Sequence, residues 1–216
     1  MDNLKQYYEQ GKLEIGLDEA GRGCLLGPVF TAGVILNDVN SYPPPYEIKD
    51  SKKCSPKIRD VLRKYIEDNS IAYCVEMIDT DRIDKVNILN ATMEGMEKCV
   101  DNITSTINVD RILVDGNHFP TYMDKSTFDF IPHVCIPGGD DKYLNIAAAS
   151  ILAKEYHDEY ILQLCKQNEI LYNYDAVNNK GYGTKSHMIA LKEYGPTEFH
   201  RKSFKPCQKP HCVHEN

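Results

Sequence analysis

Segments with the pattern of β-strands alternate along this chain with segments that have the pattern of α-helices, and no other feature of the sequence limits the fold as strongly. In the first segment, the apolar residues Leu13, Ile15 and Leu17 occupy every second position, which is the period of a strand. The strand candidates are residues 13–18, 29–36, 71–78, 111–115 and 133–136. Because two strands come first and helices separate the later ones, we expect an α/β domain in which helices cover a mixed sheet.

The helix candidates show both the apolar spacing and the end signals of amphipathic helices. Ser55 and Pro56 are suited to an N-cap and a first helical residue, and apolar residues then recur on one face. Ser186 is expected to cap a short last helix that ends at Gly195-Pro196. The other helix candidates are residues 88–103 and about 142–166.

Length, cysteine content and hydropathy limit the class of protein. A chain of 216 residues suggests one large domain, and we place it over residues 1–206, with an irregular tail over residues 207–216. No apolar run approaches the ~20 residues that cross a bilayer, and the N-terminus has no apolar signal core. The eight cysteines are scattered without a Cys-x-x-Cys pair, which favours reduced, mainly buried thiols. We therefore expect a cytoplasmic protein with no membrane partner.

Charge is distributed unevenly along the chain. The net charge of −7 argues against a protein that binds nucleic acid over its whole surface. Residues 180–209 nevertheless hold seven basic and two acidic residues, a balance of +5, so the remainder carries −12. A basic stretch beside an acidic body suits a protein that binds an anion with one part and metal cations with another. A solvated lysine-rich segment explains the same numbers, and charge alone favours that simpler explanation.

Four carboxylates stand at strand ends or directly before a helix candidate. Asp18 and Glu19 end the first strand, Asp115 ends a later one, and Asp140 follows a Pro-Gly-Gly turn. In an open α/β sheet, the carboxyl ends of the strands border the crevice where ligands bind. Carboxylates gathered there repel one another, and Mg²⁺ or Mn²⁺ would relieve the repulsion. The sequence does not show whether these strands are neighbours, so a simpler role stays open for each aspartate. Asp18 could form a turn at the end of a strand, Asp115 could begin an Asp-Gly turn, and Asp140 with Asp141 could cap the long helix.

Three short segments have side chains suited to phosphate, sugar or base. In Gly21-Arg22-Gly23, the glycines let the backbone approach a ligand closely while the guanidinium faces a phosphate or sugar. Lys52 and Lys53 precede a helix candidate, and Tyr182 stands between two glycines, where its ring can stack on a base or sugar. The respective alternatives are a tight turn, an exposed charged loop and a tyrosine that fills the core. Neither a Walker loop nor a Gly-x-Gly-x-x-Gly motif is present.

Taken in order, the motifs resemble the type 2 ribonuclease H family, and ribonuclease HII in particular. The resemblance covers about residues 12–206. The matching segments are Gly16-Leu17-Asp18-Glu19-Ala20-Gly21-Arg22-Gly23, Asp50-Ser51-Lys52-Lys53, residues 87–93, Val114-Asp115-Gly116, Gly138-Gly139-Asp140, residues 146–154, residues 180–185 with His187, and His200-Arg201-Lys202-Ser203-Phe204. The Gly-Arg-Gly form of the turn points to ribonuclease HII rather than ribonuclease HIII.

The resemblance implies an RNase H-like fold, with a mixed five-stranded sheet flanked by helices and a helical C-terminal part, about residues 165–206, that holds nucleic acid. It implies a metal-dependent endoribonuclease that cuts the RNA strand of RNA–DNA hybrids and single ribonucleotides embedded in duplex DNA, leaving 5′-phosphate and 3′-hydroxyl ends. It also implies hydrolysis with two Mg²⁺ or Mn²⁺ ions. By the same resemblance, the catalytic and metal-binding residues are Asp18, Glu19, Asp115 and Asp140.

Substrate contacts also follow from the resemblance. The Gly21-Arg22-Gly23 turn is expected to bind the 2′-hydroxyl and a neighbouring phosphate, and Tyr182 the ribose–deoxyribose junction. Lys52, Lys53 and Lys185 are expected to contact phosphates. We expect a monomer whose partners are RNA–DNA hybrid and ribonucleotide-containing DNA. The main alternative is a protein of the same fold that binds hybrid without cutting it, which would have no need of all four carboxylates.

Two residues depart from the pattern of the family. Cys24 stands where proline is usual after Gly-Arg-Gly, which could loosen the turn, and His157 stands where arginine is usual in the long helix. The sequence suggests no histidine partner for Cys24, so no cysteine nucleophile is expected. Outside the resemblance, four residues near the C-terminus could bind zinc, but their spacing fits no established zinc finger and an irregular tail is the simpler expectation. They are Cys207, His211, Cys212 and His214.

Overall fold

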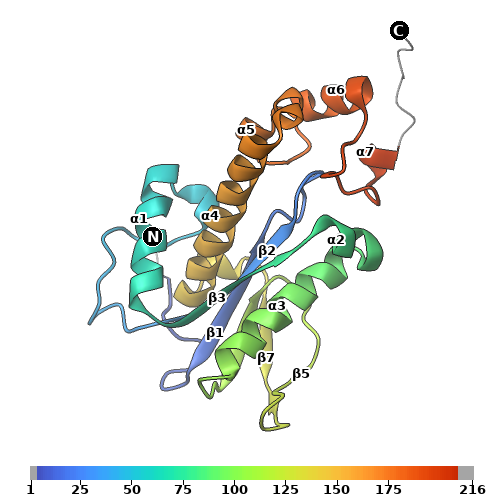
Figure 1. Cartoon of the computed structure of the whole chain (residues 1–216). Coiled ribbons are helices and arrows are strands. Elements are labelled where there is room, and N and C mark those ends of the chain that lie inside the picture. The colour runs from blue at the N-terminus through green and yellow to red at the C-terminus, as the bar shows by residue number, and fades with distance from the viewer. Residues whose placement is uncertain (1–3, 209–216) are drawn as a thin grey trace.

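The computed structural model describes residues 4–208, and its centre is a sheet with helices on both faces (Figure 1). The strands are β1 (Glu14–Ala20), β2 (Val29–Leu36), β3 (Ser70–Ile78), β4 (Arg111–Asp115), β5 (Tyr122–Met123), β6 (Phe130–Ile131) and β7 (His133–Ile136). The α-helices are α1 (Pro56–Asn69), α2 (Thr80–Val86), α3 (Ile88–Thr104), α4 (Leu144–Gln167), α5 (Ala176–Asn179), α6 (Lys185–Tyr194) and α7 (Lys205–Gln208). Short 3₁₀ helices are η1 (Ser51–Lys53), η2 (Gly139–Asp141) and η3 (Glu169–Tyr174).

The main sheet has five strands in the order β3-β2-β1-β4-β7. β2 runs antiparallel to both β1 and β3, whereas β1, β4 and β7 form the parallel part. The pairs Leu17–Val114 and Val114–Cys135 fix the register of that parallel part. The expected mixed five-stranded sheet flanked by helices is therefore confirmed.

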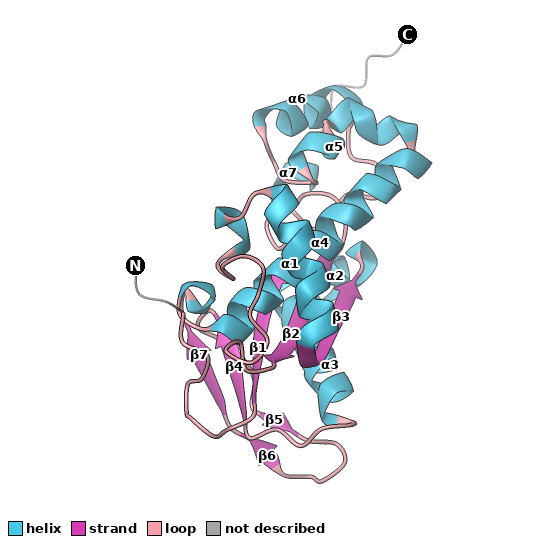
Figure 2. Cartoon of the chain, turned by 90° about the vertical axis from the view of Figure 1, so that its left-hand side faces the viewer, coloured by secondary structure: helices cyan, strands magenta, loops and turns pink. Residues whose placement is uncertain are grey.

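Different helices cover the two faces of the sheet, as Figures 1 and 2 show. α4 packs on β1 and β2 with α1 beside it, and α3 packs on β2 and β3 from the other side. Because side chains alternate along a strand, Ile15 and Leu17 of β1 pack with Met96 of α3, while Ala20 packs with Ala148 of α4. The same alternation directs Asp18 toward the α4 face.

α4 approaches the sheet closely at Gly16. A Cβ atom at this position would lie 2.3 Å from the backbone carbonyl carbon of Asn145, so only glycine fits. The Asn145 side chain then joins α4 to two strands: its Oδ1 accepts a hydrogen bond from the amide of Leu36 (3.1 Å), and its Nδ2 donates to the carbonyl of Glu14 (2.6 Å). These contacts fix the start of α4 against β1, the strand that carries Asp18.

Three local details differ from the expectations from sequence. α2, which Asp79 caps by accepting a hydrogen bond from the amide of Arg82 (2.7 Å), was not expected, and neither was the β5–β6 hairpin. The expected cap of α6 at Ser186 is wrong, because the hydroxyl of Thr184 accepts the hydrogen bond from the amide of His187 (3.4 Å). Ser186 lies in the first turn of that helix instead.

Helices also make up most of the described chain after α4, residues 168–208, and they gather beyond one end of the sheet (Figure 1). Cys207 is buried in α7, so the tail that was expected to be irregular begins as a helix. The three other candidate zinc ligands, at positions 211, 212 and 214, lie outside the described residues. The seven described cysteines are free thiols and five of them are buried, as expected. Within residues 4–208, no helix has both the length and the apolar character needed to cross a membrane.

Candidate active site

Asp18 and Asp115 lie side by side where the parallel pairing of two strands ends. β1 and β4 are neighbours whose last paired residues are Leu17 and Val114, so the residues that follow are Asp18 and Asp115. Burial raises the pKa of Asp18 well above its usual value, and the charges of Glu19 and then Asp115 raise it further. The structure thus brings together carboxylates whose strands could not be placed side by side from sequence.

Asp18 is held by its own backbone and by α4. It is 5% exposed, and its Oδ1 accepts a hydrogen bond from the amide of Glu19 (2.7 Å). A hydrogen bond with Ser150 of α4 lowers its pKa against the effect of burial. The hydroxyl of Ser150 lies 3.0 Å from that of Ser51 in η1. A buried carboxylate with acidic neighbours is costly in its charged form, and a bound cation would reduce that cost.

Asp140 reaches the same place from β7, the next parallel strand. The amide of Gly139 donates to Oδ1 of Asp115 (2.7 Å), which ties η2 to the end of β4. Burial, followed by the charge of Asp115, raises the pKa of Asp140 to about 6. Asp140 and Asp141 form η2, and the N-cap of α4 is Tyr143, so the alternative that these aspartates cap the long helix is wrong.

Glu19 and the neighbouring lysines complete the charged groups. Burial raises the pKa of Glu19, whereas Arg22 lowers it through an ion pair (Nη1 to Oε1, 3.3 Å). The charge of Lys52 lowers the pKa of both Glu19 and Asp140, so its exposed ammonium group lies near both carboxylates. The two other expected phosphate contacts differ from it: Lys53 pairs with a carboxylate of η2, Asp141 (2.6 Å), and Lys185 is exposed at the start of α6.

The chemistry of the four carboxylates fits a divalent cation. Their oxygens are the ligands that Mg²⁺ and Mn²⁺ prefer, and Mg²⁺ commonly takes one or two carboxylates together with waters and substrate phosphates. As the side chains stand, no group of three or more His, Cys, Asp or Glu residues within residues 4–208 is arranged to hold a metal ion. The raised pKa values of Asp18, Glu19 and Asp140 reflect crowded, desolvated negative charge that a cation would neutralise. A cation bound here would therefore complete its coordination with waters or substrate oxygens.

The Gly21-Arg22-Gly23 turn follows directly from β1, beside these carboxylates. Gly21 has a φ of +84°, a left-handed conformation that favours glycine. A Cβ atom there would also lie 2.5 Å from the ring of His157. Arg22 and Gly23 are exposed, so their backbone is open to a ligand.

Tyr182 lies against this turn. Cys24 and Tyr182 form an antiparallel bridge, and Cε1 of the ring is 3.9 Å from the position that a Cβ atom would take at Gly23. The ring is partly exposed, 6.1 Å from the ring of His157 and 5.3 Å from Nζ of Lys154. Burial raises the pKa of its hydroxyl to about 12. The structure therefore combines the two alternatives from sequence, because the ring is partly packed and partly open beside the turn.

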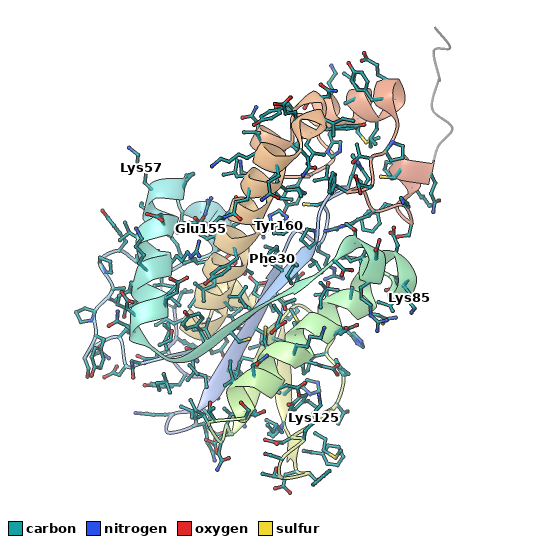
Figure 3. The ribbon with its side chains drawn as sticks, viewed as in Figure 1. Phe30, Lys57, Lys85, Lys125, Glu155 and Tyr160 are labelled. Carbon is teal, nitrogen blue, oxygen red and sulfur yellow. The ribbon has the colours of Figure 1, made fainter. Side chains whose placement is uncertain are left out.

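The two residues that depart from the family pattern contact each other. Sγ of Cys24 lies 3.6 Å from Nε2 of His157, and Nδ1 of His157 lies 3.0 Å from Oδ1 of Asp158, so the expectation that Cys24 has no histidine partner is wrong. Phe30 packs edge-on to the ring of His157, with 6.1 Å between the ring centroids. It also packs against Tyr160 (5.7 Å), and Figure 3 shows Phe30 and Tyr160 together. Cys24 is fully buried, and burial raises its pKa to about 12. A buried, protonated thiol packs the turn and does not act as a nucleophile.

A chain of hydrogen bonds that was not predicted from the sequence ends on the backbone of Tyr182. The amide of Thr197 donates to Nδ1 of His200 (3.0 Å), so we assign the proton of His200 to Nε2. That Nε2 donates to Nε2 of His187 (3.0 Å), whose Nδ1 donates to the carbonyl of Tyr182 (3.0 Å). Both histidines are buried, and burial lowers the pKa of His187. Their only signal in the sequence is their place in the matched motifs.

A groove of about 760 Å³ extends from Tyr182 along α4 and α1. Three of its four basic side chains are paired with acidic ones. Arg59 binds Glu155 and lies 3.7 Å from Asp158, which also binds Lys154 (2.8 Å), and Arg63 binds Glu67 (2.8 Å). The fourth, Lys180, donates to the carbonyl of Val177 instead. Figure 3 shows Glu155 in the space between α1 and α4. Because these charges are paired, the groove is not a uniformly basic surface.

Known proteins resemble the chain over most of its length. The family model described as ribonuclease HII matches residues 15–207. A curated ribonuclease HII from Parabacteroides distasonis is 43% identical over 205 residues, which cover 93% of this chain and 94% of the relative. The chain is thus similar in sequence to ribonucleases HII over about nine tenths of its length.

Solved structures show the same fold at lower identity. The ribonuclease H2 of Pyrococcus horikoshii has a TM-score of 0.69 at 22% identity, over 90% of this chain and 95% of that one. Bst-RNase HIII, solved in complex with Mn²⁺, has a TM-score of 0.64 at 15% identity, over 91% of this chain and 68% of that one. At such identities the two likenesses concern the arrangement of the chain alone.

Proposed function

Because the chain belongs to the ribonuclease HII family and is an RNase H endoribonuclease, we propose that it cuts the RNA strand of RNA–DNA hybrids and single ribonucleotides within duplex DNA. We propose further that the cut leaves a 5′-phosphate and a 3′-hydroxyl. One observation carries this proposal: carboxylates from neighbouring parallel strands gather beside a glycine turn and a partly exposed tyrosine.

Asp18, Glu19, Asp115 and Asp140 are the proposed catalytic and metal-binding residues, with Mg²⁺ or Mn²⁺, two ions in the active form. When bound, the ions would activate a water and stabilise the leaving 3′-oxygen. Within the chain, the amide of Gly139 orients the carboxylate of Asp115, and the amide of Glu19 orients that of Asp18. Oriented carboxylates need little rearrangement when charge develops at the phosphate.

The substrate-reading groups are the turn and the tyrosine. The backbone of Gly21-Arg22-Gly23 would form hydrogen bonds with the 2′-hydroxyl of the ribonucleotide, the group that separates RNA from DNA. The ring of Tyr182 would stack on the following sugar, where an added 2′-hydroxyl would crowd it. Their closeness, 3.9 Å between the ring and the Cβ position at Gly23, supports reading of two adjacent sugars.

Phosphate contacts would come from exposed lysines around these groups. Lys52 is the best placed, because its charge already influences two of the carboxylates. Lys53 would have to exchange its ion pair with Asp141 for a phosphate, and Lys185 would contact the duplex from α6. We propose that the chain acts as a monomer with a single domain over residues 1–206, whose helical part after about residue 165 holds the duplex.

Replacing Asp18 with asparagine tests the catalytic assignment against the alternative of a non-cutting hybrid-binding protein. Cleavage should fall by more than the roughly 100-fold that loss of an outer-shell partner of a metal costs, while duplex affinity survives. Asp110→Asn is the matched control, because Asp110 lies before β4 at the other end from Asp115 and pairs with Lys12 (3.2 Å). Near-normal turnover of Asp18→Asn would contradict the assignment, and a wild-type protein that binds hybrid without cutting it would favour the alternative.

A further inference from the structure

We propose that Arg201 is a positioning residue for ribose recognition: its guanidinium draws the carbonyls of Gly21 and Arg22 inward, so that the amides of Arg22 and Gly23 face the substrate. The inference rests on the proposed role of the Gly21-Arg22-Gly23 turn. Arg201 belongs to one of the matched motifs, but no role for it was predicted from the sequence.

The side-chain hydrogen bonds of Arg201 all go to the loop between β1 and β2, which contains the turn. The side chain is fully buried, although it belongs to the most basic stretch of the chain. Its Nε donates to the carbonyl of Gly27 (2.8 Å), Nη1 to that of Arg22 (3.0 Å), and Nη2 to those of Gly21 (2.7 Å) and Pro28 (2.9 Å). Within the described residues, these hydrogen bonds go to carbonyls and not to a carboxylate. One guanidinium thus binds both the start and the end of the loop between β1 and β2.

The geometry of the peptide bond turns these contacts into an orientation. In a planar trans peptide the carbonyl and the N–H point in opposite directions. The carbonyls of Gly21 and Arg22 point inward to Arg201, so the N–H groups of the same two peptides, those of Arg22 and Gly23, point outward. No described residue accepts a hydrogen bond from either N–H, whereas the next amide, of Cys24, donates to the carbonyl of Gly21 (3.1 Å). Two unpaired donors therefore face the side on which the turn is exposed.

The guanidinium is itself fixed in place. The amide of Arg201 donates to the carbonyl of Leu25 (2.9 Å), and the amide of Gly27 donates to the carbonyl of Phe199 (3.0 Å). The loop and the C-terminal segment are thus joined by an antiparallel bridge between Leu26 and His200. The ring of Phe204 lies 5.2 Å from the guanidinium carbon. Arginine suits this task because its planar group holds five donors in a fixed fork, whereas lysine has three donors on a flexible stem.

The test compares Arg201→Lys with Arg111→Gln as control. Arg111 is a partly buried arginine that pairs with Glu9 and Glu14, at the end of β4 far from Asp115. For each protein, duplex affinity is measured in the presence of a chelator, which prevents metal-dependent cutting. The probes are a DNA duplex with one ribonucleotide and the same duplex without it.

Wild-type protein and the control should bind the ribonucleotide duplex more tightly than the all-DNA duplex. In Arg201→Lys the ratio of these two affinities should fall about tenfold, because the amides of Arg22 and Gly23 no longer point at the 2′-hydroxyl. Its affinity for the all-DNA duplex should stay unchanged. A merely structural arginine would lower both affinities together. An undiminished ribose preference in folded Arg201→Lys, or a fall in both affinities alike, would overturn the proposal.

Amide hydrogen exchange of the free wild-type protein gives a second test that needs no variant. The amides of Arg22 and Gly23 should exchange fast, while those of Cys24 and Leu25, which have carbonyl partners, should exchange slowly. Protected Arg22 and Gly23 amides would overturn the inference even if Arg201→Lys did not fold. A wild-type protein without ribose preference would instead refute the proposed function of the turn, and the exchange pattern would still decide its orientation.

Discussion

Replacing Tyr182 with alanine should separate the cutting of single ribonucleotides from the cutting of continuous hybrid. The ring is packed on one side against His157 and lies partly open beside Gly23, 5.3 Å from the ammonium group of Lys154. In that position it can stack on a deoxyribose that follows a ribonucleotide, and a 2′-hydroxyl on that sugar would crowd it. We expect Tyr182→Ala to lose most activity on a single embedded ribonucleotide and less on hybrid.

The size of the effect follows from what the ring contacts. Base–aromatic stacking is worth about 1–3 kcal/mol, which corresponds to a loss of roughly ten- to a hundredfold in rate. Tyr182→Phe keeps the ring and removes only a hydroxyl, whose pKa burial raises to about 12, so it should retain junction activity. Removing the ring also leaves a cavity against His157, and some loss of folding stability should accompany the loss of activity.

The assay measures kcat/KM on both substrates for wild type, Tyr182→Phe, Tyr182→Ala and a packing control, Tyr156→Ala. Tyr156 is also a half-buried tyrosine, but its ring packs under Arg63 of α1 (4.0 Å) and its hydroxyl binds Glu67 (3.0 Å). Equal losses of Tyr182→Ala on both substrates would refute the junction-reading role. A matching substrate-specific loss in Tyr156→Ala would refute it as well, since packing alone would then explain the effect.

Three further outcomes are expected. Duplex affinity should fall steeply as salt is raised despite the net charge of −7, because the basic residues of the 180–209 stretch release counterions from the phosphates; a flat salt titration would contradict this. Gly21→Ala should lower Tm and the preference for ribose more than Gly11→Ala does. Both glycines have a φ above +80°, but only a Cβ atom at Gly21 would meet His157, 2.5 Å away. Equal decreases in Tm for the two variants would contradict this expectation. Asp140, with its pKa raised to about 6, is charged above that pH and protonated below it. The affinity for Mn²⁺, measured by calorimetry, should therefore fall about tenfold for each pH unit below 6. A constant affinity between pH 7 and pH 5 would exclude Asp140 as a ligand.

Local patterns predicted the fold well wherever an element was long or regularly apolar. The alternation of Leu13, Ile15 and Leu17 placed β1, and the mostly apolar run over residues 29–36 placed β2 with its observed bounds. α2 was missed because its seven residues carry too few apolar positions to show a helical period. The β5–β6 hairpin was missed for a similar reason, since each of its strands has only two residues.

The candidate site could be predicted only in part, because much of it depends on pairing between distant segments. Asp115 was recognisable as a strand end, whereas β1 continues two residues past Asp18, to Ala20. The closeness of the two carboxylates comes from the register between β1 and β4, which neither segment encodes alone. The contact between Cys24 and His157 arises in the same way, from α4 crossing the end of β1 and β2. Local sequence could not show either contact.

Arg201 illustrates a different limit. In the sequence it is one of seven basic residues between 180 and 209 and counts toward a surface that binds phosphate. In the structure its neighbour Lys202 is exposed, whereas Arg201 is fully buried and donates its hydrogen bonds to backbone carbonyls. A count of charges cannot distinguish a surface cation from one that shapes the backbone of the site.

The most direct test of the whole account is the incubation of the protein with a DNA duplex that carries one ribonucleotide, with Mg²⁺, with Mn²⁺ or with a chelator, followed by identification of the new ends. The account predicts a cut only when a divalent cation is present, with a 5′-phosphate and a 3′-hydroxyl, because water is the attacking group. A cut that persists in chelator, or one that leaves a 2′,3′-cyclic phosphate, would contradict it, since the second product requires attack by the ribose 2′-hydroxyl itself.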